Sequence, residues 1–339
     1  MVKKRTKSKR GPRKSSRGPE RTLQTLKIVS GLSVLVLMVL GAGFLAHQFW
    51  SGRSAPIAAA VRPRERLPVP PVQAPKKPVY EVYSKSTSPV KPPTQLPQLP
   101  QLPGARPPLV AIIIDDIGYD RHVADQLLAL DVPLTFSLLP EAPFSQQIAV
   151  QARTKGLEIM LHLPMEPNEY PAVNPGPGAL LADMTPDALI AQLNQDLEQF
   201  SGLKGVNNHM GSRLSTSPEK MRQIFSILKK RGLYYVDSRT STETVAEPSA
   251  RLLQLAFAER DIFIDHEEDA AFIRSQLAQL IKRAQVQGYA VGIAHPHAIT
   301  YQVLQEFLPQ LKAKVALVPA STVVQQSMLA EAGPSQATR

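Results

Sequence analysis

VAIIIDDIG, from Val110 to Gly118, is a run of five apolar residues that leads directly into two adjacent carboxylates and a glycine. A short run rich in β-branched residues and bounded by turn signals predicts a buried strand of a parallel sheet. Ligand sites of such sheets lie at the carboxyl ends of the strands. Neighbouring side chains on a strand point to opposite faces, so the backbone must turn where Asp115 and Asp116 appear. We therefore expect the two acids to have different roles, one toward a metal and one toward a proton. The alternative is that one Asp caps the following helix and the other forms an ion pair with a basic neighbour.

Outward from this stretch, strand-like runs alternate with helical ones between residues 109 and 325. This alternation predicts one α/β domain with a mostly parallel sheet, either open or closed into a barrel. About 215 residues are enough for such a domain to bury a core. The expected strands are 133–140, 157–163, 205–208, 233–237, 261–265, 289–295 and 315–321; the expected helices are 122–130, 145–155, 186–200 with Thr185 as N-cap, 218–231, 272–287 and 299–311; residues 326–339 are expected to be a flexible tail.

The N-terminal third has a different composition. Residues 1–27 contain eleven Lys or Arg against one Glu, and residues 28–50 contain no acid, Lys or Arg. That apolar length matches a transmembrane helix, and the positive charge before it predicts a cytoplasmic tail with the rest of the chain outside. A cleaved signal peptide is the alternative, since Ala58, Ala59 and Ala60 are small, but the apolar run is longer than usual for a signal.

Residues 51–108 contain fifteen prolines, including QLPQLPQLP at 95–103, and predict an extended linker that holds the next domain off the membrane. The linker is also a candidate docking site for envelope protein partners. The net charge of the chain is +11, but the excess lies in the first 108 residues without interleaved aromatic residues, so we expect no nucleic-acid partner. The absence of cysteine excludes thiolate metal sites and cysteine nucleophiles.

Residues that can bind a metal or transfer a proton lie at the ends of most strands of the predicted sheet. A lone histidine in such a place is more often structural, but repeated occurrence at one edge of a sheet indicates a site. One carboxylate and two imidazoles with open positions suit a divalent ion, with zinc as the expected one, that acts on water. These residues are Asp115 and Asp116, His162, His209, Asp237 with Arg239, Asp265 with His266, and His295 with His297.

The chain resembles a divergent polysaccharide deacetylase, a branch related to metal-dependent carbohydrate esterases. The resemblance covers residues 109–324 and is carried by IIIDDIG, EIMLHLPMEP (158–167), GVNNHMGSRL (205–214), VDSRTS (236–241) and GIAHPH (292–297). It implies a deformed (β/α) barrel that removes acetyl groups from sugars. In the wider superfamily the first Asp of the pair is the general base and the second binds metal, which assigns these roles to Asp115 and Asp116.

The resemblance also assigns His162 as a metal ligand and His295 as the general acid, with His297 as the alternative acid. The superfamily places a second metal-binding histidine four residues after the first, where this chain has Glu166. Either Glu166 or His209 therefore completes the ligand set, and we expect His209. The remaining candidates, expected to support the site or contact substrate, are Glu166, Asn208, Asp237, Arg239 and His297. Asp237 and Arg239 fit equally well as an ion pair that holds two strands.

Together these features predict a single-pass protein of the bacterial inner membrane, with a cytoplasmic N-terminus and a periplasmic deacetylase domain that acts on an acetylated polysaccharide or peptidoglycan. A non-catalytic module that binds metal and glycan is the main alternative, and an anchored scaffold that recruits partners through the linker is a third. The acid pair and His295 favour the enzyme, because binding alone needs no general base.

Overall fold

The structure, a computed structural model, describes residues 107–332. The basic tail, the predicted membrane helix at 28–50 and the linker up to residue 106 lie outside the described residues, so these assignments remain predictions. Between residues 107 and 332, no helix has the length and apolar character needed to cross a bilayer.

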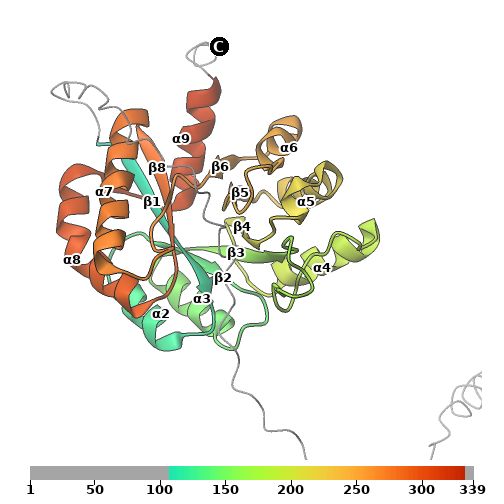
Figure 1. The fold of residues 1–339 in the computed structure, drawn as a ribbon, viewed down its shortest axis with the longest axis horizontal. Coiled ribbons are helices and arrows are strands. Elements are labelled where there is room, and N and C mark those ends of the chain that lie inside the picture. Colours follow the sequence, from blue (N-terminus) through green and yellow to red (C-terminus); the bar gives the residue numbers. More distant parts are fainter. Residues whose placement is uncertain (1–106, 333–339) are drawn as a thin grey trace, which may run out of the picture. The chain divides into compact units, whose positions relative to one another are not determined.

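Strands and helices alternate along the described residues (Figure 1). The strands are β1 (Leu109–Ile117), β2 (Thr135–Leu138), β3 (Glu158–Met165), β4 (Gly205–Met210), β5 (Tyr234–Asp237), β6 (Phe257–Glu259), β7 (Ile262–Phe263), β8 (Tyr289–Ala294) and β9 (Ala316–Leu317). The helices are α2 (Arg121–Leu128), α3 (Ser145–Thr154), α4 (Pro186–Glu198), α5 (Pro218–Lys230), α6 (Ala246–Leu253), α7 (Ala270–Gln287), α8 (Ala298–Lys314) and α9 (Ala320–Ala332), with a short 3₁₀ turn η1 (Leu214–Thr216).

The strands form one parallel sheet in the order β6-β5-β4-β3-β2-β1-β8-β7, and β9 pairs with the start of β1. The two edge strands, β6 and β7, are separated by only two residues. The Arg260 N–H donates to the Asp237 carbonyl of β5, whereas the Asp261 N–H donates to the Val291 carbonyl of β8. The chain therefore passes from one edge of the sheet to the other within one residue, and the sheet curls. This confirms the predicted α/β fold with parallel strands.

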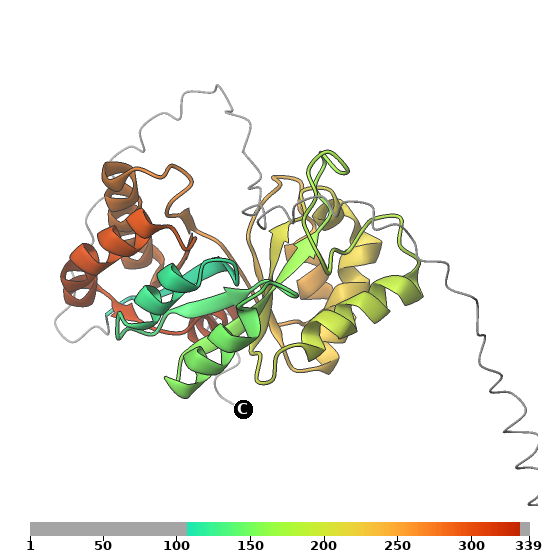
Figure 2. The same ribbon diagram turned by 90° about the horizontal axis from the view of Figure 1, so that it is seen from below.

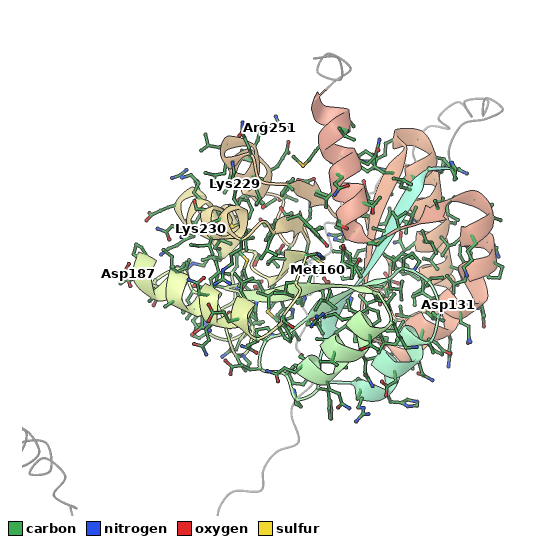
Figure 3. All side chains as sticks on the ribbon, turned by 180° about the vertical axis from the view of Figure 1, so that it is seen from behind. Asp131, Met160, Asp187, Lys229, Lys230 and Arg251 are labelled. Atoms are coloured by element: carbon green, nitrogen blue, oxygen red, sulfur yellow. The ribbon has the colours of Figure 1, made fainter. Side chains whose placement is uncertain are left out.

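Helices cover the outer face of the curled sheet and lie to its left and to its right in Figure 2. Side-chain alternation sends Val110, Ile112 and Ile114 of β1 outward, where they pack in the main core beneath the helices. Ala111 and Ile113 point inward to a second cluster. Met160 of β3 belongs to this inner cluster and lies among the strands in Figure 3, while Lys229 and Arg251 lie on outer helices.

Helix α9 fills the inner cluster from the amino ends of the strands. Its Val323 and Val324 pack in that cluster, and α9 contacts β1, β5, β6 and β8. The first N–H groups of the helix are fixed by side chains: Ala320 N donates to Thr135 Oγ1 (3.0 Å) and Ser321 N donates to Glu158 Oε1 (3.0 Å). A carboxylate at a helix N-terminus is favourable because that end carries partial positive charge.

The structure differs from the sequence prediction mainly in the last third of the domain. The strand expected at 315–321 is limited to β9, and residues 326–332, expected in a flexible tail, continue α9. Helix α6 and strand β6 were not expected. The predicted N-cap at Thr185 is confirmed, since its Oγ1 accepts the Ala188 N–H. These differences leave the strand ends that carry the candidate site in place.

Candidate metal centre

Polar side chains occupy the carboxyl end of the sheet's inner face. On β1, Asp115 follows Ala111 and Ile113 on that face, and on β3, His162 follows Met160. On β4, β5 and β8, every second side chain likewise points to the inner face. Side chains that are far apart in sequence therefore meet at the carboxyl end of this face. The polar residues with this register are Asp115, His162, Asn207, His209, Ser238 and His295, and all are buried.

Asp116 joins this group through a backbone turn. Its φ is 53°, in the left-handed region that Asp adopts more readily than most residues, and the register of β1 with β2 is interrupted between Ile114 and Ile117. The turn expected at the acid pair is therefore confirmed. Asp115 follows the strand alternation and Asp116 departs from it, so both carboxylates come to the same end of the inner face.

Asp116, His162 and His209 present three donor atoms to one point. His162 Nε2 lies 3.0 Å from Asp116 Oδ1, His209 Nδ1 lies 2.9 Å from the same oxygen, and the two nitrogens are 3.2 Å apart. Bonds of about 2.0–2.1 Å to a tetrahedral ion separate its ligand atoms by about 3.3 Å. The three observed separations are close to that value, so these side chains fit a divalent metal.

The state of the Asp116 carboxylate supports the same interpretation. It is buried, and neither oxygen has a hydrogen bond of normal geometry within residues 107–332. Burial alone would raise the pKa of Asp116, but the imidazoles of His209 and His162 hold the pKa well below its ordinary value. A buried, ionised carboxylate that lacks hydrogen-bond donors is typical of a metal ligand.

Asn207 connects the metal ligands to the neighbouring acid. Its Nδ2 donates to Asp115 Oδ1 (2.7 Å), and its Oδ1 accepts Ser137 Oγ (2.6 Å) and faces His162 Nδ1 (2.8 Å). A carboxylate only accepts, so the amide nitrogen must face Asp115 and the amide oxygen must face His162. His162 therefore carries its proton on Nδ1, which leaves the Nε2 lone pair for a metal.

Asp115 and His295 are the two groups of this pocket with pKa values suited to proton transfer. Burial raises the pKa of Asp115, although His162, His295 and Asn207 oppose the increase. Burial lowers the pKa of His295, but the charge of Asp265 outweighs this, and with Asp116 and Asp115 raises it to about 9. Near neutral pH, Asp115 is a base of increased strength and His295 is a charged acid.

Asp265 fixes His295 in position. One of its oxygens lies 3.0 Å from His295 Nδ1, while the other accepts the His295 backbone N–H (2.7 Å) and Thr300 Oγ1 (2.7 Å). His295 itself lines the pocket. His297, expected as the alternative acid, lies nearby and its Nδ1 is 3.7 Å from the Glu268 carboxylate. Asp265, His295 and His297 also form a second group with metal-ligating atoms, but the Asp265 oxygens already accept these three bonds.

The metal ligands and proton-transfer groups line one pocket of about 60 Å³, whereas a single water needs about 10–15 Å³. The pocket therefore has room for a small acyl group. Its lining consists of Asp115, Asp116, His162, Asn208, His209, Met210, Ser238, Thr240, Arg260, Phe263, Ile293 and His295.

Glu166 lies outside the metal-ligating group. Its Oε1 is 2.6 Å from Arg213 Nη1, and its Oε2 accepts the Ala182 N–H. Glu166 thereby ties the end of β3 to two loops, at residue 182 before α4 and at residue 213 after β4. The structure places His209, rather than Glu166, beside Asp116 and His162.

The other predicted residues lie around the pocket. Asn208 lines it and ties β4 to β5, because its Oδ1 accepts Tyr235 OH (3.0 Å) and Ser238 N (2.9 Å). Asp237 has the opposite register from Ser238, and its carboxylate accepts the Arg239 N–H and Thr244 Oγ1. Arg239 binds Glu259 of β6 at 2.7 Å, so its guanidinium reaches an acid outside the pocket.

Sequence reasoning did not assign side-chain roles to four residues of this region. Asn207 and Ser238 share the inward register of His209 and Val236, so strict strand alternation would have selected both. Asp265 was expected only among the residues that end strands, because its contact with His295 depends on the pairing of β7 with β8. Arg260 lies on the two-residue link between the edge strands, where no periodic pattern indicates a direction.

A family model for divergent polysaccharide deacetylases matches residues 112–324. The chain belongs to this family. The resemblance carried by the motifs is thus confirmed, and the matched segment contains each of the residues discussed above as part of the pocket.

Two curated proteins and one solved structure are similar to this chain. YibQ of Escherichia coli K12, described as uncharacterized, is 30% identical over 225 residues, which cover 66% of this chain and 70% of that protein. A second uncharacterized protein, from Haemophilus influenzae Rd, is 30% identical over 209 residues, which cover 62% of this chain and 74% of that protein. Among solved structures, the uncharacterized protein ATU2773 of Agrobacterium tumefaciens C58 has a TM-score of 0.62 and 26% identity, covering 65% of this chain and 90% of that one.

Proposed function

We propose that this protein is a membrane-anchored, extracytoplasmic, metal-dependent deacetylase that acts on an acetylated polysaccharide of the cell envelope. The observation that carries the proposal is the convergence of Asp116, His162 and His209 on one point, in a pocket that also contains Asp115 and His295. Membership of the divergent polysaccharide deacetylase family supports the reaction class. The apolar segment 28–50 and the basic tail before it support the anchor and the topology.

Asp116, His162 and His209 would hold the metal, and their oxygen and nitrogen atoms suit zinc. When bound, such an ion polarises a carbonyl and lowers the pKa of water from 15.7 toward about 7. The ligand set has one carboxylate and two imidazoles, which leaves open positions for water and substrate.

Asp115 is the proposed general base. Asn207 holds one of its oxygens, and its raised pKa makes it a stronger proton acceptor than an exposed aspartate. It takes a proton from the water that attacks the acetyl carbon. His295 is the proposed general acid, because Asp265 keeps it protonated and oriented. It donates a proton to the sugar nitrogen or oxygen that leaves when the acyl bond breaks.

Acetate release tests the proposal. The full-length protein loaded with zinc is incubated with acetylated chito-oligosaccharides and with peptidoglycan, beside an Asp115→Asn variant that keeps the metal ligands. We expect acetate from at least one of these glycans, and a loss of more than about 100-fold in the variant, since general acid–base groups contribute about 10²–10⁴-fold. Full metal occupancy with no acetate from either glycan would instead indicate a binding module. A reporter fused after Arg339 tests the topology, and activity of the reporter in the cytoplasm would contradict it.

A further inference from the structure

Ser238 places a buried hydroxyl in the pocket that the proposed chemistry does not use. The residue follows the end of β5, lines the pocket and is 7% exposed. Its Oγ has no hydrogen-bond partner among residues 107–332. Buried hydroxyls are normally bonded, so an unpaired hydroxyl that lines a pocket indicates a group that a ligand completes.

Thr240 and Asn208, which also line the pocket, use their polar atoms within the chain. Thr240 Oγ1 donates to the Met210 carbonyl (2.9 Å) and accepts from Asn208 Nδ2 (3.3 Å). Asn208 Nδ2 also donates to the Met210 carbonyl (2.8 Å). Asn208 Oδ1 accepts Tyr235 OH and the Ser238 N–H. The side chains of Thr240 and Asn208 therefore serve the fold, whereas Ser238 Oγ does not.

The main chain of Ser238 is fixed on both sides. Its N–H donates to Asn208 Oδ1 (2.9 Å), and its carbonyl accepts Arg260 Nε (2.8 Å). The next residue, Arg239, has a φ of 53°, and its N–H donates to Asp237 Oδ1 (2.8 Å). The hydroxyl thus lies on a backbone that is already in place before a ligand binds. A donor fixed in this way is effective in catalysis, because it costs no rearrangement during the reaction.

The sheet register places Ser238 beside a proposed metal ligand. Asn207 of β4 pairs with Val236 of β5, and the same register continued by two residues brings Ser238 next to His209. Both side chains have the inward direction, and neighbouring strands lie about 4.8 Å apart. The Ser238 hydroxyl therefore lies on the side of the metal-binding group that β4 and β5 form.

Asp115 and His295 lie on the other side of that group. In the sheet order, β3 and β2 separate β4 from β1. On the far side, β1 pairs with β8, and Ile114 lies beside Ala294, so the residues that follow them, Asp115 and His295, are neighbours. The attacking water must lie beside Asp115, because this carboxylate takes its proton. The acyl carbonyl oxygen is then the reacting atom on the side of Ser238.

We propose that Ser238 Oγ donates a hydrogen bond to the carbonyl oxygen of the bound acetyl group. This inference rests on the proposed function, because it adds a group to the same reaction. The carbonyl oxygen becomes negative when water attacks the carbonyl carbon, and the hydrogen bond strengthens as that charge develops. The proton stays on Ser238 throughout, so the hydroxyl is a donor and not a nucleophile.

A small acyl compound tests the contact whichever glycan is the substrate. Acetohydroxamate carries an acetyl carbonyl and binds zinc, and calorimetry measures its affinity for the zinc-loaded, full-length protein. We expect Ser238→Ala to weaken its binding about 10-fold or more, because a hydrogen bond to a charged group is lost. Zinc affinity should stay unchanged. With an isotope-labelled carbonyl, infrared spectra of the bound compound should show a higher carbonyl stretching frequency in the variant.

Three results with this compound would overturn the proposal. The first is equal affinity and equal carbonyl frequency in wild type and Ser238→Ala. The second is no binding of acetohydroxamate to wild type at full zinc occupancy. The third is a lower melting temperature of Ser238→Ala, because a hydroxyl without a partner in the fold should not contribute to stability.

Kinetics distinguish this role from binding of the sugar. On the acetylated glycan that wild type deacetylates best, Ser238→Ala should lower kcat about 10- to 100-fold with little change in KM, because the bond is strongest in the transition state. Ser226→Ala removes a hydroxyl that donates to the Arg222 carbonyl on the outer helix α5, and this matched control should change neither constant. A raised KM with unchanged kcat in Ser238→Ala would assign the hydroxyl to the sugar and contradict the proposal.

The two proposals fail separately. If Ser238→Ala loses affinity for acetohydroxamate but wild type releases no acetate from acetylated chito-oligosaccharides or peptidoglycan, the deacetylase proposal fails and the acyl-binding role of Ser238 stands. If wild type releases acetate and Ser238→Ala does so with the same kcat, the reaction stands and the inference fails.

Discussion

His209 Nδ1 lies 2.9 Å from Asp116 Oδ1, although the two residues are 93 positions apart and reach this point from different strands. His209 is thus the candidate that lies beside Asp116 and His162, and we propose it as the third metal ligand. Glu166 instead holds two loops together.

This relationship predicts a contrast between two variants. His209→Ala should weaken zinc binding by more than about 100-fold, because loss of a supporting group alone costs about 10–100-fold. Glu166→Gln should leave zinc affinity unchanged. Calorimetric titration with zinc measures both. Retained zinc affinity in His209→Ala, together with a loss in Glu166→Gln, would transfer the ligand role to Glu166.

Asn207 should be necessary for both the metal site and the base. Asn207→Ala removes the acceptor of His162 Nδ1 and the donor to Asp115 Oδ1, so zinc affinity should fall about 10–100-fold and kcat should fall as well. Asn194→Ala, on the outer helix α4 where Asn194 binds Arg231, is the control and should change neither. Unchanged zinc affinity in Asn207→Ala would exclude the proposed role in fixing the His162 tautomer.

The contact between Asp265 and His295 predicts the alkaline limit of activity. His295 must be protonated to act as an acid, so kcat/KM should fall as pH rises through the raised pKa of about 9. Asp265→Asn removes the charge that raises this pKa, and the alkaline limit should move toward or below the ordinary histidine value of about 6.5. If kcat/KM fell at the same alkaline pH in wild type and Asp265→Asn, the proposed role of Asp265 would be contradicted.

The same contact has a consequence for stability. A pKa that is raised in the folded state stabilises the fold fully below about pH 6.5, and this contribution is lost as pH rises toward about 9. The difference in unfolding free energy between wild type and Asp265→Asn should therefore be larger at pH 6 than at pH 9.5. Urea unfolding at the two pH values measures it.

Glu158 should stabilise the docking of α9. Its Oε1 accepts Ser321 N and Tyr234 OH (2.8 Å), and Glu158→Gln removes the negative charge at the helix N-terminus. We expect a loss of about 1–2 kcal/mol of unfolding free energy. Glu306→Gln breaks an exposed pair with Arg274 and should cost less than about 1 kcal/mol. Equal losses in the two variants would show that the α9 contact contributes no more than a surface ion pair.

The parallel fold and the acid pair followed from the sequence because each depends on local pattern. Buried runs such as Val110–Ile114 predict strands by composition, and parallel strands place their carboxyl ends at one edge. The same logic selects Asn207 and Ser238 when alternation is counted from His209 and Val236. It also assigns Asp237 to the opposite face from Ser238, although Asp237 had been grouped with the site.

Features that depend on tertiary context were not predictable in this way. The sequence at 315–321 predicts a strand, but β9 ends at Leu317 and α9 begins at Ala320, and Val323 and Val324 of this helix pack in the inner cluster. Packing thus overrides local propensity. The link through Arg260 and the contact between Asp265 and His295 arise only when the sheet curls and β7 pairs with β8.

The metal centre can be tested by zinc titration of the metal-free, full-length protein, followed by acetate release from the glycan that it deacetylates best. We predict no acetate release without metal, a rise with added zinc, and a plateau at one ion per chain, with no rise in Asp116→Asn. Full activity of metal-free protein, or a zinc-dependent rise that persists in Asp116→Asn, would contradict it.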